Sequence, residues 1–213
     1  MLHHERHVKI LAVCLSALAG YVDAIGFLAL GGLYVSFMSG NSTQLGVGFI
    51  EALQPPAISA ALIAAFVLGV VAGSSAGRLG KAHQRAATLL LVAAVLAAAA
   101  LVGRVADRHV AMVVAAVAMG AENAVFERES IGVTYMTGAL VKVGQGIAGA
   151  LAGGSWTAWL PYLYLWLALI AGAAGGAAAY PRFGLDALWF GAIAAAALAG
   201  AATLAGIDTE PGS

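Results

Sequence analysis

Polar side chains that could carry proton or cation chemistry interrupt two long apolar runs of this chain. Asp23 lies inside the first run, and Glu122 and Asn123 lie inside a later one. An ionisable group in a lipid bilayer is costly, so it usually faces the interior of a helix bundle or a watery cavity. We therefore interpret Asp23 and Glu122 as groups that handle a proton or a cation, with Asn123 offering amide hydrogen bonds. The alternative is structural: a buried carboxylate bonded to a serine or to backbone, which locks two helices together.

Two short polar turns, Ser39-Gly40-Asn41 and Thr137-Gly138, each precede a predicted short helix. The start of a helix presents free N–H groups and the positive end of the helix dipole, which suits an anion or a polar oxygen. We interpret both turns as parts of a binding site for a small solute or ion. The alternative is a pair of architectural loops that close a helix bundle and bind nothing.

Lys142 lies on the second of these predicted short helices. Its ammonium group could pair with Asp23 or Glu122, or it could attract an anionic substrate. The alternative is a lysine whose long side chain extends to the membrane interface. The sequence leaves these two interpretations open.

Catalysis has little support in the sequence. Every histidine lies in the N-terminal flank or in a predicted loop, so none within an apolar run can act as a general base for Ser39. The chain has no zinc-ligand spacing, P-loop or dinucleotide-binding glycine pattern. We therefore predict no enzyme activity, no cofactor and no metal site.

The composition is that of an integral membrane protein. Of the 213 residues, 62% are hydrophobic and only 9% are charged, whereas roughly a quarter of the residues of a soluble domain are charged. The bilayer must therefore solvate much of the apolar surface. Ten basic residues balance ten acidic ones, which gives no indication of a nucleic-acid partner. Cys14 is the only cysteine, so no disulfide can form within the chain.

The segment from Gly20 to Gly46 occurs a second time, in altered form, from Gly120 to Gly144. The aligned pairs include Asp23 with Asn123, Met38 with Met136, Ser39 with Thr137, and Gly40 with Gly138. This duplication predicts an all-α polytopic bundle of two repeats, each with a broken or re-entrant segment made of an extended piece and a short helix. The predicted organisation is a cytoplasmic flank at 1–9, a first repeat at 10–103, a connector at 104–109, a second repeat at 110–206 and a polar tail at 207–213.

Six segments are long and apolar enough to cross a bilayer. They are Ile10–Leu30, Ala57–Gly77, Ala86–Val102, Val110–Phe126, Trp159–Ala179 and Leu185–Leu204. The predicted broken segments combine an extended piece with a short helix, Leu33–Met38 with Thr43–Leu53 and Val133–Met136 with Ala139–Leu151. If these segments re-enter, each half has three crossings and the second half is inverted. If they cross fully, each half has four crossings and the halves are parallel.

The distribution of basic residues favours the inverted arrangement with a cytoplasmic N-terminus. The re-entrant topology places six basic residues inside (Arg6, Lys9, Arg78, Lys81, Arg85, Arg128) and three outside (Arg104, Arg108, Arg182). The fully crossing topology places four inside (Arg6, Lys9, Arg104, Arg108) and the other five outside. Because cytoplasmic loops carry an excess of Lys and Arg, the first topology fits better.

The motifs VDAIGFLALGG, FMSGN and TYMTG resemble those of the YoaK family of bacterial inner-membrane proteins, a domain family of unknown function. The matching residues are Gly20, Asp23, Ala24, Met38, Ser39, Gly40 and Asn41 in the first half, and Asn123, Ala124, Thr137 and Gly138 in the second. Glu122 and Ser39 depart from the family pattern, which usually has Gln and Thr there. The resemblance implies about six spans, a bacterial cytoplasmic membrane and a suspected transport role.

The sequence therefore favours a small secondary transporter of an unknown solute or ion, with its site between the two broken segments. The alternative is a membrane scaffold or subunit that transports nothing and whose polar groups serve helix packing. The lipid bilayer is the expected partner. Small-residue faces rich in glycine would also allow a homodimer.

Overall fold

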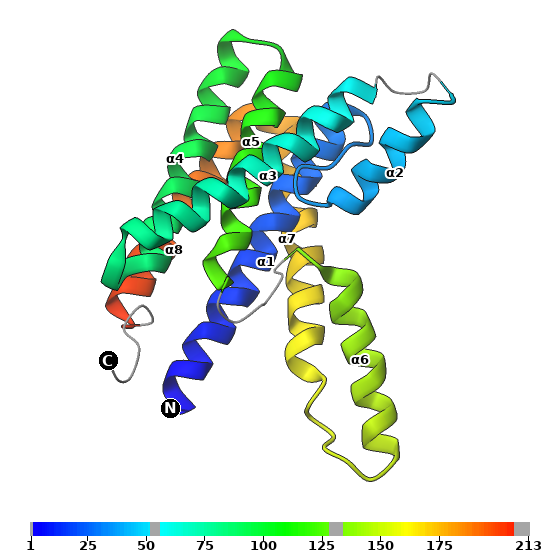
Figure 1. Cartoon of the computed structure of the whole chain (residues 1–213), viewed down its shortest axis with the longest axis vertical. Coiled ribbons are helices and arrows are strands. Elements are labelled where there is room, and N and C mark those ends of the chain that lie inside the picture. The colour runs from blue at the N-terminus through cyan, green and yellow to red at the C-terminus, as the bar shows by residue number, and fades with distance from the viewer. Residues whose placement is uncertain (1, 52–55, 128–133, 207–213) are drawn as a thin grey trace.

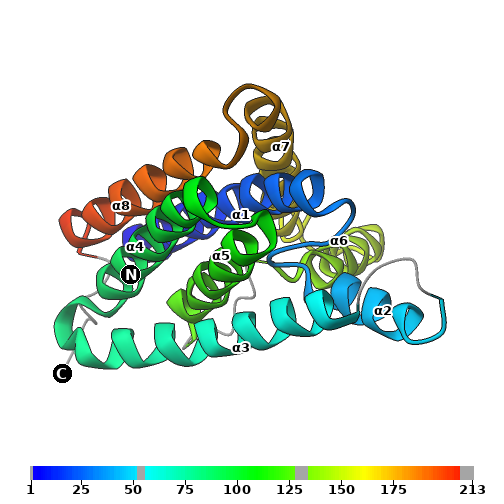
Figure 2. The same cartoon turned by 90° about the horizontal axis from the view of Figure 1, so that it is seen from above.

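The computed structural model describes residues 2–51, 56–127 and 134–206, and this part of the chain is all-α without a strand. Figures 1 and 2 show a bundle of long helices with two shorter helices at one side. The helices are α1 (Leu2–Leu30), α2 (Met38–Gly48), α3 (Pro56–Leu79), α4 (Gln84–Val105), α5 (Arg108–Asn123), α6 (Met136–Leu151), α7 (Leu160–Phe183) and α8 (Leu188–Leu204). Three short 3₁₀ helices follow α3, α5 and α7, namely η1 (Lys81–His83), η2 (Ala124–Phe126) and η3 (Gly184–Ala187).

Five stretches of the described chain are long and apolar enough to cross a membrane. They are Arg6–Leu30, Pro56–Leu79, Lys81–Val105, Arg108–Phe126 and Leu160–Leu204. The last stretch, of 45 residues, includes α7, η3 and α8. The predicted fold class, an all-α polytopic membrane bundle, is therefore confirmed.

The start of each short helix differs from the prediction. The sequence placed Ser39-Gly40-Asn41 in a turn before the helix, but α2 already begins at Met38, and α6 begins at Met136. The reason is that the backbone carbonyl of Phe37 accepts from the N–H groups of Gly40 and Asn41, which closes the first helical turn without a side-chain cap. The [Ser/Thr]-Gly pairs are therefore first-turn residues of the two helices.

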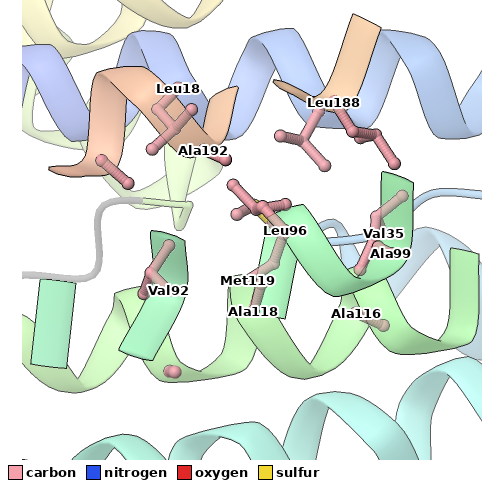
Figure 3. Close-up of a cluster of buried hydrophobic side chains, with 14 of the residues drawn as sticks. Leu18, Val35, Val92, Leu96, Ala99, Ala116, Ala118, Met119, Leu188 and Ala192 are labelled. Atoms are coloured by element: carbon pink, nitrogen blue, oxygen red, sulfur yellow. The ribbon is translucent and has the colours of Figure 1, made fainter. Parts of the chain in front are cut away.

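The core is built from closely packed aliphatic and small side chains of α1, α4, α5 and α8. Figure 3 shows Leu96 of α4 lying among Met119 of α5, Leu18 of α1 and Ala192 of α8. Val35, which belongs to the irregular segment between α1 and α2, is also fully buried in this core. Irregular backbone inside a membrane bundle is tolerated only where protein or a water-filled cavity covers it, and here the bundle covers it.

Two helix pairs make the closest backbone contacts, α1 with α7 and α3 with α5. A Cβ atom added at Gly20 of α1 would lie 2.1 Å from the carbonyl oxygen of Leu169 in α7. A Cβ atom added at Gly120 of α5 would lie 2.0 Å from the carbonyl oxygen of Phe66 in α3. These matching contacts support the predicted internal repeat, which remains our interpretation of the fold.

Glycine pairs on α7 and α3 complete these two interfaces. Gly172 and Gly176 face α1, while Gly69 and Gly73 face α5. In each pair three residues separate the glycines, the spacing that lets membrane helices approach backbone to backbone. The glycines thus serve helix packing at both interfaces.

The direction of each helix can be followed in Figure 1. Helices α1, α4 and α7 run toward the upper end of the view, and α3, α5 and α8 run toward the lower end. The segment after α1 turns back into the bundle, and α2 then returns to the upper end, whereas α6 returns to the lower end. The two short helices α2 and α6 thus end at opposite ends of the bundle, as two re-entrant segments that enter from opposite sides would.

Candidate functional site

Asp23 holds the irregular segment between α1 and α2 in place. Its Oδ1 atom accepts hydrogen bonds from the backbone N–H groups of Val35, at 2.7 Å, and Ser36, at 2.6 Å. Its Oδ2 atom accepts from the Ser36 hydroxyl at 2.6 Å. The carboxylate thus satisfies backbone donors that would otherwise be buried without partners. This is the structural arrangement that the sequence left open as the alternative for Asp23.

Asn41 provides the second anchor of the same segment. It is fully buried, and its amide oxygen accepts from the Tyr34 N–H at 2.9 Å while its amide nitrogen donates to the Tyr34 carbonyl at 2.6 Å. One side chain therefore satisfies both backbone groups of Tyr34, as an adjacent strand would. The sequence predicted Asn41 to bind a ligand, and in the structure its amide bonds to the backbone of Tyr34 and its nitrogen also contacts Met38 Sδ at 3.7 Å.

Asn123 makes the corresponding contact in the second half of the chain. Its amide oxygen accepts from the Thr134 hydroxyl at 3.0 Å, and its amide nitrogen donates to the Met119 carbonyl at 2.9 Å. Asn123 thus joins α5 to the residue that leads into α6, as Asp23 joins α1 to Ser36. Sequence reasoning missed Ser36 and Thr134 as partners. Both residues stand two positions before an aligned methionine, and this shared spacing is the signal that could have identified them.

Glu122 differs from all of these groups because its carboxyl group is buried without a hydrogen bond. Its side chain is fully buried, and neither carboxyl oxygen has a hydrogen-bond partner among the described residues. It lies close enough to Asp23 for the two groups to interact electrostatically. A buried, unpaired carboxylate would cost several kcal/mol. Protonation of Glu122 would avoid this cost, whereas the carboxyl group of Asp23 accepts three hydrogen bonds.

A cavity of about 640 Å³ lies against Asp23. Tyr34 and Phe37 line it from the irregular segment between α1 and α2, and Thr134 and Met136 line it from the start of α6. Gly20, Ala24, Phe27 and Leu28 of α1 and Leu169, Ile170, Ala173, Ala174 and Ala177 of α7 form the rest of its wall. The two segments that the sequence predicted to meet at a site thus border one cavity, which is mainly apolar.

The remaining predicted site residues do not line this cavity. Ser39 and Thr137 are exposed on the first turns of α2 and α6. A Cβ atom at Gly40 would meet the ring of Phe37 at 2.6 Å, and one at Gly138 would meet the ring of Tyr135 at 2.3 Å. These glycines therefore make room for an aromatic ring over the start of each short helix.

Lys142 lies on an exposed face of α6. Among the described residues it has no hydrogen bond or ion pair, and α6 packs mainly against α7. The structure therefore does not bring Lys142 to Asp23 or Glu122. Its placement agrees with the alternative of a lysine side chain that extends away from the bundle.

Comparison with known proteins places the chain among uncharacterised membrane proteins. The family described as "Protein of unknown function (DUF1275)" matches residues 11–201. A UPF0700 transmembrane protein of Rhizobium meliloti (strain 1021) is 37% identical over 197 residues, which cover 90% of this chain and 84% of that protein. No solved structure matches the chain.

Proposed function

Because the chain belongs to the DUF1275 family of proteins of unknown function, we infer its function from its site and propose that it is a small secondary transporter. The resemblance to an uncharacterised family that the sequence motifs suggested is confirmed, and so is the multi-pass membrane character. In the proposed function, a small solute or ion crosses a bacterial inner membrane through the cavity beside Asp23. The N-terminus would face the cytoplasm.

One observation carries this proposal: the cavity is bordered both by residues that follow α1 and by residues at the start of α6. Tyr34 and Phe37 come from the segment after α1, and Thr134 comes from the segment before α6. In transporters built from inverted repeats, broken helices meet near the middle of the membrane and form the substrate site between the repeats. Movement of one half against the other would then open the cavity to each side in turn.

The helix directions and glycine contacts support the inverted arrangement on which this proposal depends. The interface of α1 with α7 and that of α3 with α5 each join one half to the other. Both interfaces consist of small residues in close backbone contact, for example at Gly20 and Gly120. Such surfaces could slide against each other with few side chains in the way, which is what alternating access would require.

A membrane scaffold is the second candidate, and the hydrogen bonds of Asp23 are the observation that favours it. Asp23 anchors Val35 and Ser36, so it has a structural role whatever else it does. A scaffold gives no reason for a cavity between the segment after α1 and the start of α6. It also gives no reason for the carboxyl group of Glu122 to be buried without a hydrogen bond from any described residue.

Thiol labelling from the two sides of the membrane tests transport without knowledge of the substrate. In a Cys14→Ala background, Ala173→Cys places one thiol on the cavity wall, and Ala178→Cys places one on an exposed part of α7 outside the wall. We expect a membrane-impermeant maleimide to label Ala173→Cys from either side of oriented vesicles. The Ala178→Cys thiol, which faces lipid in this arrangement, should stay largely unlabelled. Labelling of Ala173→Cys from one side only would contradict alternating access and favour the scaffold.

A further inference from the structure

The charge and the rings that line the cavity point to a particular class of ligand. Resting on the proposed transport function, we propose that the cavity binds a monovalent organic cation, a substituted ammonium with an apolar body. The carboxylate of Asp23 would attract the charge, and the aromatic rings of Phe27, Tyr34 and Phe37 would contact the groups around it.

Asp23 supplies the one acidic side chain on the described cavity wall. Asp23 accepts hydrogen bonds from two N–H groups and a hydroxyl, an arrangement that suits the ionised form. Glu122 receives no hydrogen bond from any described residue, and it is not on the cavity wall. Asp23 is the only charged residue on the cavity wall as described, and Lys142 lies elsewhere. A monovalent cation would therefore match the charge of the site.

The aromatic residues on the wall form a connected cluster beside this charge. The ring centroids of Phe27 and Tyr34 are 5.3 Å apart, and those of Tyr34 and Phe37 are 5.1 Å apart in an edge-to-face pair. All three residues line the cavity. The face of an aromatic ring attracts a cation, and clusters of such rings recognise quaternary ammonium groups. The same rings offer an apolar surface to the substituents.

Other ligand classes fit the cavity less well. An anion would need free donors, but the N–H groups of Val35 and Ser36 already donate to Asp23. An inorganic cation such as Mg²⁺ or Ca²⁺ needs several oxygen ligands, whereas the wall is almost entirely carbon. A volume of about 640 Å³ lies within the range of roughly 300–1,000 Å³ that holds drug-sized organic molecules.

Three probes of similar shape separate charge from size. Phenyltrimethylammonium carries a positive charge, tert-butylbenzene is its neutral counterpart, and benzenesulfonate is negative. We expect the purified full-length protein in lipid nanodiscs to bind phenyltrimethylammonium at least about tenfold more tightly than either other probe, since a charge pair near a protein surface can contribute several kcal/mol. Equal binding of the cation and tert-butylbenzene would overturn the proposal and indicate a groove for lipid chains. Preference for benzenesulfonate would also overturn it.

Two variants link this binding to the named residues. Asp23→Asn removes the charge, but the amide can still accept from Val35 and Ser36, so we expect a folded protein with at least about tenfold weaker cation binding. Tyr34→Leu removes the central ring and should weaken binding about fivefold. Cation binding that is unchanged in both variants would overturn the proposal. The labelling of Ala173→Cys reports separately on transport, so alternating access without cation binding would reject only the ligand class.

Discussion

Replacing Gly120 with alanine is expected to destabilise the protein by about 3 kcal/mol, near the upper end of the range for overpacking. The added Cβ atom would lie 2.0 Å from the carbonyl oxygen of Phe66, which belongs to the backbone of α3 and cannot rotate away. The two helices would therefore have to separate along their interface. Gly20→Ala should have the same effect at α7, where the corresponding oxygen of Leu169 lies 2.1 Å away.

Matched controls come from glycines that lie in open surroundings. At Gly144 of α6 and Gly200 of α8 an added Cβ atom would meet nothing within 4 Å. Alanine favours a helix by about 0.5–1 kcal/mol over glycine, so these two substitutions should preserve or raise stability. The free energy of unfolding, measured by denaturant titration in detergent, checks both expectations. Gly120→Ala and Gly20→Ala proteins as stable as the controls would contradict the close packing of α3 with α5 and of α1 with α7.

Replacing Asp23 with alanine is expected to lower the free energy of unfolding by about 3 kcal/mol, whereas asparagine should cost about 1 kcal/mol. Alanine leaves the N–H groups of Val35 and Ser36 without their acceptor. Asparagine keeps that acceptor, and its amide can donate to the Ser36 hydroxyl. The second half of the chain has an asparagine at the corresponding position, where the amide oxygen of Asn123 accepts from the Thr134 hydroxyl.

The comparison of these two Asp23 variants separates the structural role of the side chain from its charge. Thermal and chemical unfolding of both variants should be followed by tryptophan fluorescence in the same detergent. Equal destabilisation by alanine and asparagine would show that the negative charge, and not the hydrogen bonds, stabilises the segment around Val35. That result would contradict our assignment of stability to the hydrogen bonds of Asp23 and of cation binding to its charge.

Hydrophobicity made much of this fold predictable from the sequence. The apolar runs located the long helices. The position of Asp23 within an apolar run predicted that it faces the bundle interior or a cavity, and in the structure it lines a cavity. These features depend on local composition and spacing, which can be read directly from a sequence.

The partners of the polar side chains could not be predicted in the same way. Asn41 has the composition of a turn residue, but its role depends on Tyr34 folding back beside it. Lys142 lies on the same helix as Thr137 and Gly138, which the sequence also proposed for the site. Its exposure depends on how α6 packs against α7, which the sequence does not show. The lack of a hydrogen bond to Glu122 from any described residue depends on tertiary packing, which no local pattern encodes.

Uptake of radiolabelled phenyltrimethylammonium into proteoliposomes is the most direct test of the central claim, that the cavity beside Asp23 carries a solute across the membrane. With an inside-negative membrane potential, we expect saturable uptake by the wild-type protein and uptake near that of empty liposomes for Asp23→Asn. Saturable uptake that disappears with this one charge would support the account. Binding by the wild-type protein without uptake above that of empty liposomes would contradict it, and would leave a membrane protein that binds a cation but does not transport it.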